Sequence, residues 1–383
     1  MRIALVTHYY PAHRGGIELV AAEIARRLAA RHGAEVAWHA SDCDPPPAIP
    51  GVSCVPARSC NAIEQHSGVP YPLWSPGALR RVAQAARAAD VVHLHDCLYL
   101  PQLVACAAAR LAGRPVIVTQ HVGMVPYRNP LLRGALFVAY RLLARWVLGG
   151  AAQVVFVSDA VRRYFERFVR FKSPPALVAN GVDSAIFHPI EASERAKLRA
   201  ELGTSPQTPL FLFVGRFVEK KGLPVLRQLA ERMADARWIF AGWGELDPER
   251  WGLPNVTVMR RRSGAELAPL FQAADLLVLP STGEGFPLVV QEAMACGTPA
   301  LIGTDTAAGC PEAADWLLAE DTAGRDVAAR WERRLRELTR AAQRLADLRA
   351  PVAAYAVNHW SWDRCAERYA EIVRRCAPAR ARP

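Results

Sequence analysis

Two glutamates lie eight residues apart in the segment LLVLPSTGEGFPLVVQEAMACGTPALI, residues 276–302. The segment has the pattern of an apolar strand, a glycine-containing loop, a helix and a second apolar strand, with Glu284 in the loop and Glu292 in the helix. A loop carboxylate at the carboxyl end of a strand can accept hydrogen bonds from sugar hydroxyls, and a helix carboxylate can reach a ribose. Free N–H groups at the start of the helix attract phosphate. The pattern therefore favours two glutamates that contact the hydroxyl groups of a ligand over two solvated glutamates beside ordinary turns.

A second segment, FLFVGRFVEKKGLPVL at residues 211–226, carries cations in a loop that follows a buried strand. Arg216 and Lys221 leave the carboxyl end of that strand, where a pair of cations can clamp a diphosphate. The same charges can stabilise the negative charge that develops when a phosphate leaves. The neighbouring Lys220 is left out of the predicted site.

A glycine pair, Gly15–Gly16, follows the apolar run at residues 3–6 and precedes an amphipathic helix. Glycines at the start of a helix let the backbone approach an anion without a side chain in the way. Gly16 is therefore a further candidate for phosphate contact.

These motifs resemble those of the retaining glycosyltransferases of family 4, and the likeness extends from the glycine pair to the closing W-S-W-D segment. The resemblance implies the GT-B fold, an α/β architecture of two Rossmann-like, doubly wound domains that face a central cleft. It implies that Glu284 contacts the donor sugar and that Glu292 contacts the nucleotide ribose. Amides beside Gly285, Phe286 and Leu288 would approach the sugar or the phosphates.

The resemblance also assigns roles to residues at other strand ends. Arg216 and Lys221 would bind the donor phosphates, and His121, in the segment Thr119-Gln120-His121, would lie at the reaction centre. His95 and Asp96, after the strand at residues 91–94, become candidates on the acceptor side.

The implied reaction moves a hexose or an N-acetylhexosamine, with retention, from a UDP- or GDP-linked donor to an acceptor hydroxyl. We expect the acceptor to be a lipid-linked glycan or glycolipid of bacterial cell-envelope or polysaccharide synthesis. Three alternatives stay open: a soluble small-molecule acceptor, a sugar-nucleotide epimerase of the same fold, and a non-catalytic basic module that binds membrane or nucleic acid. No nucleic-acid-binding motif accompanies the basic charge.

The candidate site residues are held by short apolar runs that alternate with helical patterns along the chain. This alternation predicts parallel sheets flanked by helices. Turn-forming residues between 173 and 209 mark the expected junction. The predicted domains are 1–185 on the acceptor side, 186–360 for the nucleotide sugar, and a closing helix with a frayed tail at 361–383 that packs across both.

Charge and composition bear on partners and location. The net charge is +11, and residues 1–190 hold 20 Lys and Arg against 11 Asp and Glu, so the predicted acceptor side carries most of the surplus. Nine scattered cysteines, and the lack of a long uncharged apolar stretch, favour a cytoplasmic protein with free thiols. The apolar, arginine-bearing segment at 131–148 suggests peripheral association with the inner membrane face, and a buried helix whose arginines reach solvent fits the same pattern. The aromatic residues at 68–76 are expected to be exposed, where they could hold a lipid or a sugar.

No metal or other cofactor is expected, because Arg216 and Lys221 supply the positive charge that a divalent cation would bring. The sequence Asp42-Cys43-Asp44 has the spacing of a metal-binding DxD motif, but it lies in a proline-rich segment of the N-terminal half. We interpret it as a surface loop.

Overall fold

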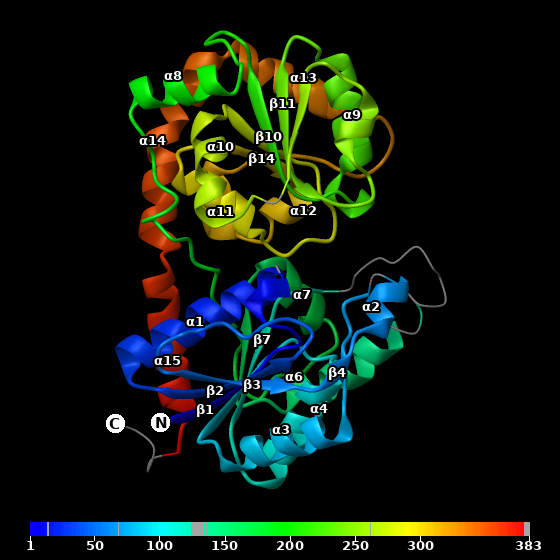
Figure 1. Ribbon diagram of the computed structural model, residues 1–383, viewed down its shortest axis with the longest axis vertical. Helices are drawn as coiled ribbons and strands as arrows, with labels where there is room; N and C mark the ends of the chain where they lie inside the picture. The colour runs from blue at the N-terminus through cyan, green and yellow to red at the C-terminus, as the bar shows by residue number, and fades with distance from the viewer. Residues whose placement is uncertain (14, 68, 124–133, 135–136, 261, 379–383) are drawn as a thin grey trace. The chain divides into compact units, whose positions relative to one another are not determined.

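The computed structural model of this chain describes residues 1–383 apart from 14, 68, 124–133, 135–136, 261 and 379–383. The chain forms two compact units, one of Met1–Asn180 with Trp362–Pro383 and the other of Gly181–Ser361. Each unit contains a parallel sheet flanked by helices (Figure 1), which confirms the predicted α/β class. The chain leaves the first unit within the junction expected at residues 173–209 and returns to it at Trp362.

The sheet of the first unit has seven strands in the order β3-β2-β1-β6-β7-β8-β9, and its neighbouring strands are parallel. They are β1 (Arg2–Val6), β2 (Glu35–Ser41), β3 (Val52–Ala57), β6 (Val91–His95), β7 (Val116–Gln120), β8 (Gln153–Phe156) and β9 (Ala176–Leu177). The apolar runs predict β1, β6, β7 and β8. They miss β2, where a buried histidine interrupts the run, and β3, an edge strand that contains a proline.

Helices cover this sheet, and a short antiparallel pair lies beside it. The elements are η1 (Pro11–His13), α1 (Gly16–His32), β4 (Ser59–Cys60), α2 (Ala62–Ser67), β5 (Leu73–Trp74), α3 (Pro76–Ala88), α4 (Leu100–Leu111), the π-helical turn η2 (Tyr140–Ala144), α6 (Arg145–Gly149), α7 (Asp159–Glu166) and α15 (Trp362–Cys376). Helix α1 buries Val20, Ile24 and Leu28 on the face that its apolar spacing predicts, and it ends at Gly33, whose φ is 59°.

Helix α15 is the closing helix that the sequence predicts near residues 361–376. It packs on α1 in the first unit, where Arg27 donates a hydrogen bond to Asp363 at 2.8 Å. Deeper in the same unit, Thr119 of β7 donates to the hydroxyl of Tyr369 at 3.1 Å. These bonds anchor the returning chain on the first unit, whereas packing across both domains stays a prediction.

The second unit has a six-stranded sheet in the order β12-β11-β10-β13-β14-β15, again with parallel neighbours. Its strands are β10 (Leu210–Arg216), β11 (Arg237–Trp243), β12 (Val256–Met259), β13 (Leu276–Leu279), β14 (Ala300–Gly303) and β15 (Leu318–Glu320). Its helices are α8 (Ala192–Glu201), η3 (Glu219–Lys221), α9 (Leu223–Arg232), η4 (Pro248–Trp251), η5 (Gly264–Glu266), α10 (Ala268–Ala273), α11 (Leu288–Ala295), α12 (Thr304–Ala307), η6 (Pro311–Trp316), α13 (Val327–Arg340) and α14 (Ala342–His359).

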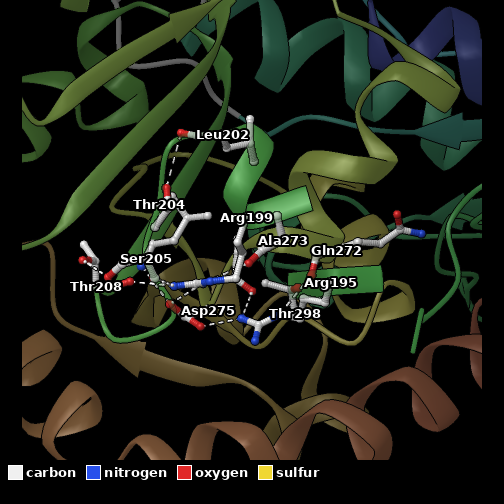
Figure 2. Close-up of polar contacts among 12 residues, drawn as sticks. Arg195, Arg199, Leu202, Thr204, Ser205, Thr208, Gln272, Ala273, Asp275 and Thr298 are labelled. Atoms are coloured by element: carbon white, nitrogen blue, oxygen red, sulfur yellow. Dashed lines mark hydrogen bonds and ion pairs between the residues drawn. The ribbon is translucent and has the colours of Figure 1, made fainter. Parts of the chain in front are cut away.

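Asp275, directly before β13, ties α8 to the sheet of the second unit (Figure 2). Its carboxylate accepts hydrogen bonds from Arg199 at 3.0 Å and from the backbone N–H of Leu210, the first residue of β10, at 2.8 Å. The buried guanidinium of Arg199 also donates to the carbonyl oxygens of Ser205 and Thr208. These bonds pair a buried guanidinium and tie the start of β10 to α8 and to the residue before β13.

The loop at residues 68–76 does not present its aromatic rings to solvent in the way that the sequence suggests. Trp74 lies in β5, which pairs with β4, and the tryptophan is only 4% exposed. Tyr71 is half-buried, and its hydroxyl donates to the carbonyl of Leu98 at 3.1 Å. The prediction of exposed aromatics is therefore wrong for these two residues, because strand pairing turns the indole into the core.

Candidate functional site

The predicted donor site is built on two neighbouring strands of the second unit. Strands β10 and β13 pair in parallel, so the loops that follow them start at the same edge of the sheet. The backbone N–H of Thr282, after β13, donates to the carbonyl of Lys220, after β10, at 2.8 Å. Gly222 has a φ of 81°, and a Cβ there would lie 2.3 Å from the carbonyl oxygen of Pro280. Only glycine fits this close approach of the two loops.

Glu284 is held between two lysines at this edge. Its Oε2 lies 3.1 Å from Lys221 Nζ, and its Oε1 lies 3.6 Å from Lys220 Nζ. Burial alone would raise the pKa of the Glu284 carboxyl, but the two ammonium groups outweigh that effect and hold the pKa below its ordinary value. Glu284 is therefore a carboxylate at neutral pH, and its buried Oε1 has no hydrogen-bond partner among the described residues.

Lys220 is the residue that sequence reasoning misses here. Two adjacent lysines in a loop give no signal of which one faces the site. The structure turns both toward Glu284, because η3 tightens the chain between β10 and α9. The lysine pair and Glu284 are thus one electrostatic unit.

Helix α11 carries the rest of the glutamate motif. It begins at Leu288, with Pro287 as its N-cap. Phe286 is buried, with its ring 5.3 Å from that of Trp360, and Gly285 links it to Glu284. The ring of Phe286 therefore packs as a core side chain and leaves only its backbone to face a ligand.

Glu292 lies in the fifth position of α11 and is half-buried. Burial raises the pKa of its carboxyl to about 7, because no cation compensates the loss of water around the charge. No hydrogen bond to its side chain occurs among the residues that the structure describes. Glu284 and Glu292 thus have opposite electrostatic environments in one motif.

Arg216 ends β10 with an exposed side chain that makes no ion pair within the described part of the chain. It stands opposite Trp243 of β11 in the sheet register. Its free guanidinium extends the positive charge of the lysine pair along the same sheet edge.

In the first unit, the structure brings together the three predicted residues of β6 and β7. His95 ends β6, and its Nδ1 lies 2.8 Å from Nε2 of His121, which follows β7. The backbone N–H of His121 donates to Asp96 Oδ1 at 2.9 Å, and Asp96 has a φ of 63°, a conformation that is rare outside glycine. Burial raises the pKa of Asp96 to about 6, and burial lowers the pKa of His121 to about 3. His121 is therefore a neutral ring at physiological pH.

His8 and Glu18 are a buried pair that sequence reasoning misses. His8 follows β1, and its Nε2 lies 2.9 Å from Glu18 Oε1 in the first turn of α1. Gly15 is the N-cap of α1, whereas the predicted Gly16 is the first helical residue and has open space beside it. The strand, glycine pair and glutamate could be seen in the sequence, but their convergence could not.

The DxD sequence holds loops together. Asp42 Oδ1 accepts hydrogen bonds from the backbone and the hydroxyl of Ser59, and Asp44 lies 2.8 Å from His13. Both aspartates therefore have structural partners, in line with the interpretation as a surface loop. Within the described ranges, no group of three or more His, Cys, Asp or Glu has the arrangement of a metal site.

Comparison with known proteins identifies the family. Residues 14–185 match the family described as Glycosyltransferase Family 4, and residues 208–338 match Glycosyl transferases group 1. A D-inositol 3-phosphate glycosyltransferase of Xylanimonas cellulosilytica is 30% identical over 325 residues, which cover 74% of each chain. The chain belongs to the family 4 glycosyltransferases.

A second relative and a solved structure are also similar to this family 4 glycosyltransferase. An alpha-maltose-1-phosphate synthase of Mycobacterium tuberculosis is 29% identical over 312 residues, 75% of this chain and 77% of the other. The structure of Anabaena HepE in complex with UDP-glucose superposes with a TM-score of 0.74 at 19% identity, over 97% of this chain and 99% of that one. The predicted GT-B fold is therefore confirmed. None of the helices in the described parts of this glycosyltransferase is both long and apolar enough to cross a membrane.

Proposed function

We propose that this glycosyltransferase moves a hexose or N-acetylhexosamine, with retention and without a metal, from a UDP- or GDP-linked donor to an acceptor hydroxyl. The observation that carries the proposal is the Glu284 carboxylate held between Lys221 and Lys220 where β10 and β13 end. It supports a donor site because cations for a diphosphate stand beside a carboxylate that can accept hydrogen bonds from a sugar.

The charges of the site suit bond cleavage at the donor sugar. Arg216, Lys220 and Lys221 would stabilise the negative charge that grows on the leaving diphosphate. Glu284, ionised because of the lysines, would bind sugar hydroxyls, and Glu292 would bind the ribose. In the retaining reaction, the bond from the anomeric carbon to phosphate breaks, the bond to the acceptor oxygen forms on the same face, and the acceptor proton goes to the leaving phosphate.

Nucleotide binding is the first test. We expect UDP or GDP, but not ADP, to raise the melting temperature of the wild type, since a ligand that binds only the folded state stabilises it by about 2.7 kcal/mol at a hundred times its Kd. The shift should be lost in Arg216→Ala and kept in Arg227→Ala, which removes an exposed arginine of α9. No shift with any of the nucleotides would refute the donor site.

A lipid-linked acceptor is supported by an exposed apolar face in the first unit. Val138, Leu142 and Trp146 follow one another at helical spacing and are 55%, 61% and 42% exposed. Arg141 lies beside them, with its guanidinium 4.5 Å from the centre of the Phe137 ring. Arg133, which belongs to the same predicted segment, lies outside the described residues. Apolar side chains with interspersed arginines suit the interface of an anionic membrane.

Liposome flotation tests this face. We expect the wild type to float with vesicles that contain phosphatidylglycerol at low salt, and Leu142→Glu with Trp146→Glu to stay in the soluble fraction. Leu246→Glu serves as a control at an exposed leucine of the second unit. A wild type that does not bind such vesicles would refute peripheral association.

A soluble acceptor is the second candidate, because the two relatives carry the names of enzymes that act on inositol phosphate and make maltose 1-phosphate. Transfer from UDP-glucose and GDP-mannose to octyl glucoside, glucose 1-phosphate and D-inositol 3-phosphate separates the candidates. Reaction with octyl glucoside alone favours the glycolipid, and reaction with either phosphate favours the soluble acceptor. Conversion of the donor to an epimer without any acceptor would instead support the epimerase alternative.

A further inference from the structure

The pair of His8 and Glu18 is nearly excluded from water in the first unit. Their side chains are 4% and 2% exposed, and the ring of His8 stacks on that of Tyr99 with centroids 4.1 Å apart and planes within 6°. The stack and the 2.9 Å contact to Glu18 fix the ring on two sides. A ring held so firmly presents its remaining nitrogen, Nδ1, in one direction.

Gly15 makes room for this arrangement. A Cβ at position 15 would lie 2.0 Å from Glu18 Oε2, so any other residue would push the carboxylate away from His8. Gly15 therefore leaves space for the Glu18 carboxylate, whereas the open space beside Gly16 stays available for a ligand.

His8, Glu18, His95 and Asp96 form a cluster in which several buried polar atoms lack hydrogen-bond partners. His8 Nδ1, Glu18 Oε2, Asp96 Oδ2 and His95 Nε2 have no hydrogen-bond partner among the described residues. Asp96 belongs to the same electrostatic cluster, since both His8 and Glu18 affect the pKa of its carboxyl. Buried polar groups are normally satisfied, so this set points to a bound molecule that supplies the missing bonds.

The chemistry of the cluster selects the molecule. With Nε2 turned to Glu18, Nδ1 is the nitrogen left for a ligand, and a hydroxyl can pair with it because a hydroxyl both donates and accepts hydrogen bonds. Two carboxyl groups nearby disfavour a phosphate, which would be repelled. The cluster therefore suits a neutral hydroxyl group of a sugar or another polyol.

We propose that His8 is a specificity-determining residue, whose Nδ1 binds a non-reacting hydroxyl of the acceptor, and that Glu18 is the positioning residue that orients it. The proposal rests on the proposed transfer to a hydroxyl-bearing acceptor. It adds that recognition in the first unit is directed at hydroxyls, so that a phosphate or a lipid on the acceptor is bound elsewhere.

Two isosteric variants separate the two ring nitrogens. His8→Gln keeps an amide donor for Glu18 but lacks an atom at Nδ1, and His8→Asn keeps a polar atom near Nδ1 but leaves Glu18 unpaired. We expect His8→Gln to lower kcat/KM about 10- to 100-fold for whichever of octyl glucoside, glucose 1-phosphate and D-inositol 3-phosphate the wild type uses, since a lost bond to a substrate hydroxyl costs about that much. His8→Asn should retain more of the activity and melt at a lower temperature.

Deoxy acceptors make the test specific. With one deoxy form of that acceptor, the wild type should be as slow as His8→Gln is with the parent acceptor. His8→Gln itself should react equally fast with this deoxy acceptor and with the parent acceptor. If His8→Gln slows the parent acceptor and every deoxy acceptor by the same factor, or slows none, the proposal is wrong. Should His8→Gln fail to fold, Glu18→Gln replaces it, with a several-fold loss and the same deoxy pattern expected.

The outcomes also separate this proposal from the function on which it rests. Wild type without any transfer would overturn the proposed function. If the wild type transfers normally and His8→Gln still prefers the parent acceptor over the deoxy acceptors as strongly as the wild type does, only the role of His8 is overturned. Stabilisation by UDP or GDP, a property assigned to the second unit, should be the same in all variants.

Discussion

The substitution Glu292→Gln should make the protein more stable and the donor site weaker at the same time. Burial raises the pKa of Glu292 from 4.5 to about 7. Between these two values the folded protein binds a proton that the unfolded chain does not, so the stability falls as the pH rises. Above pH 7 the folded state carries a half-buried carboxylate without a compensating cation. Glutamine removes that cost and keeps nearly the same shape.

The magnitude follows from the two pKa values. One pKa unit corresponds to about 1.4 kcal/mol, so a rise from 4.5 to about 7 makes Glu292 roughly 3 kcal/mol less favourable at pH 8 than at pH 4. This is an upper value, because Glu292 is only half-buried and water screens part of its charge. For a unit of this size, about 3 kcal/mol corresponds to roughly 6 to 12 °C in Tm.

Thermal unfolding at pH 5 and pH 8 tests the reasoning. We expect the melting temperature of Glu292→Gln to equal that of the wild type at pH 5 and to be clearly higher at pH 8. The exposed Glu312→Gln control should have the melting temperature of the wild type at both pH values. Affinity for the nucleotide found by thermal shift should fall about tenfold in Glu292→Gln at pH 8, because an ionised acceptor of the ribose hydroxyls is lost. Equal melting temperatures of variant and wild type at pH 8 would refute the electrostatic argument. An unchanged nucleotide affinity would refute the ribose role.

Three further changes test the scaffold and the cations of the second unit. Arg199→Ala should destabilise the protein by about 3 kcal/mol, since it takes the donor away from three backbone carbonyls and removes one of the two arginines that pair with Asp275; urea unfolding compared with the exposed Arg227→Ala would measure it. Gly222→Ala should lower the yield of folded protein and abolish nucleotide stabilisation, because its Cβ would collide with a backbone carbonyl; normal stabilisation by UDP or GDP would contradict this. Lys221→Ala should weaken UDP or GDP binding more than Lys220→Ala, since its ammonium group lies closer to Glu284; calorimetric titration would show the order, and equal affinities would contradict it.

The elements of the donor site were readable before the structure, because their signals are local. An apolar run, turn residues and a helix start are sufficient to predict the strand, loop and helix around Glu284 and Glu292. The same holds for Arg216 and Lys221 after β10. The parallel sheets follow from the alternation of such units along the chain. β2 and β3 escape this reasoning because a polar residue and a proline interrupt their apolar runs.

What the sequence by itself determined is the strands, loops and helices around the donor motifs, and which residues lie at the ends of those strands. Only the tertiary structure decided which strand ends are neighbours. The pairing of β10 with β13 brings both Lys220 and Lys221 to Glu284, and the pairings of β1 with β6 and of β6 with β7 gather His8, His95 and His121. The burial of Trp74 was also decided by the tertiary structure, because it depends on the pairing of β5 with β4. Contacts and burial depend on residues far apart in the chain, whereas propensities and turn signals depend on near neighbours, and so the chemistry of both clusters appears only in the folded protein.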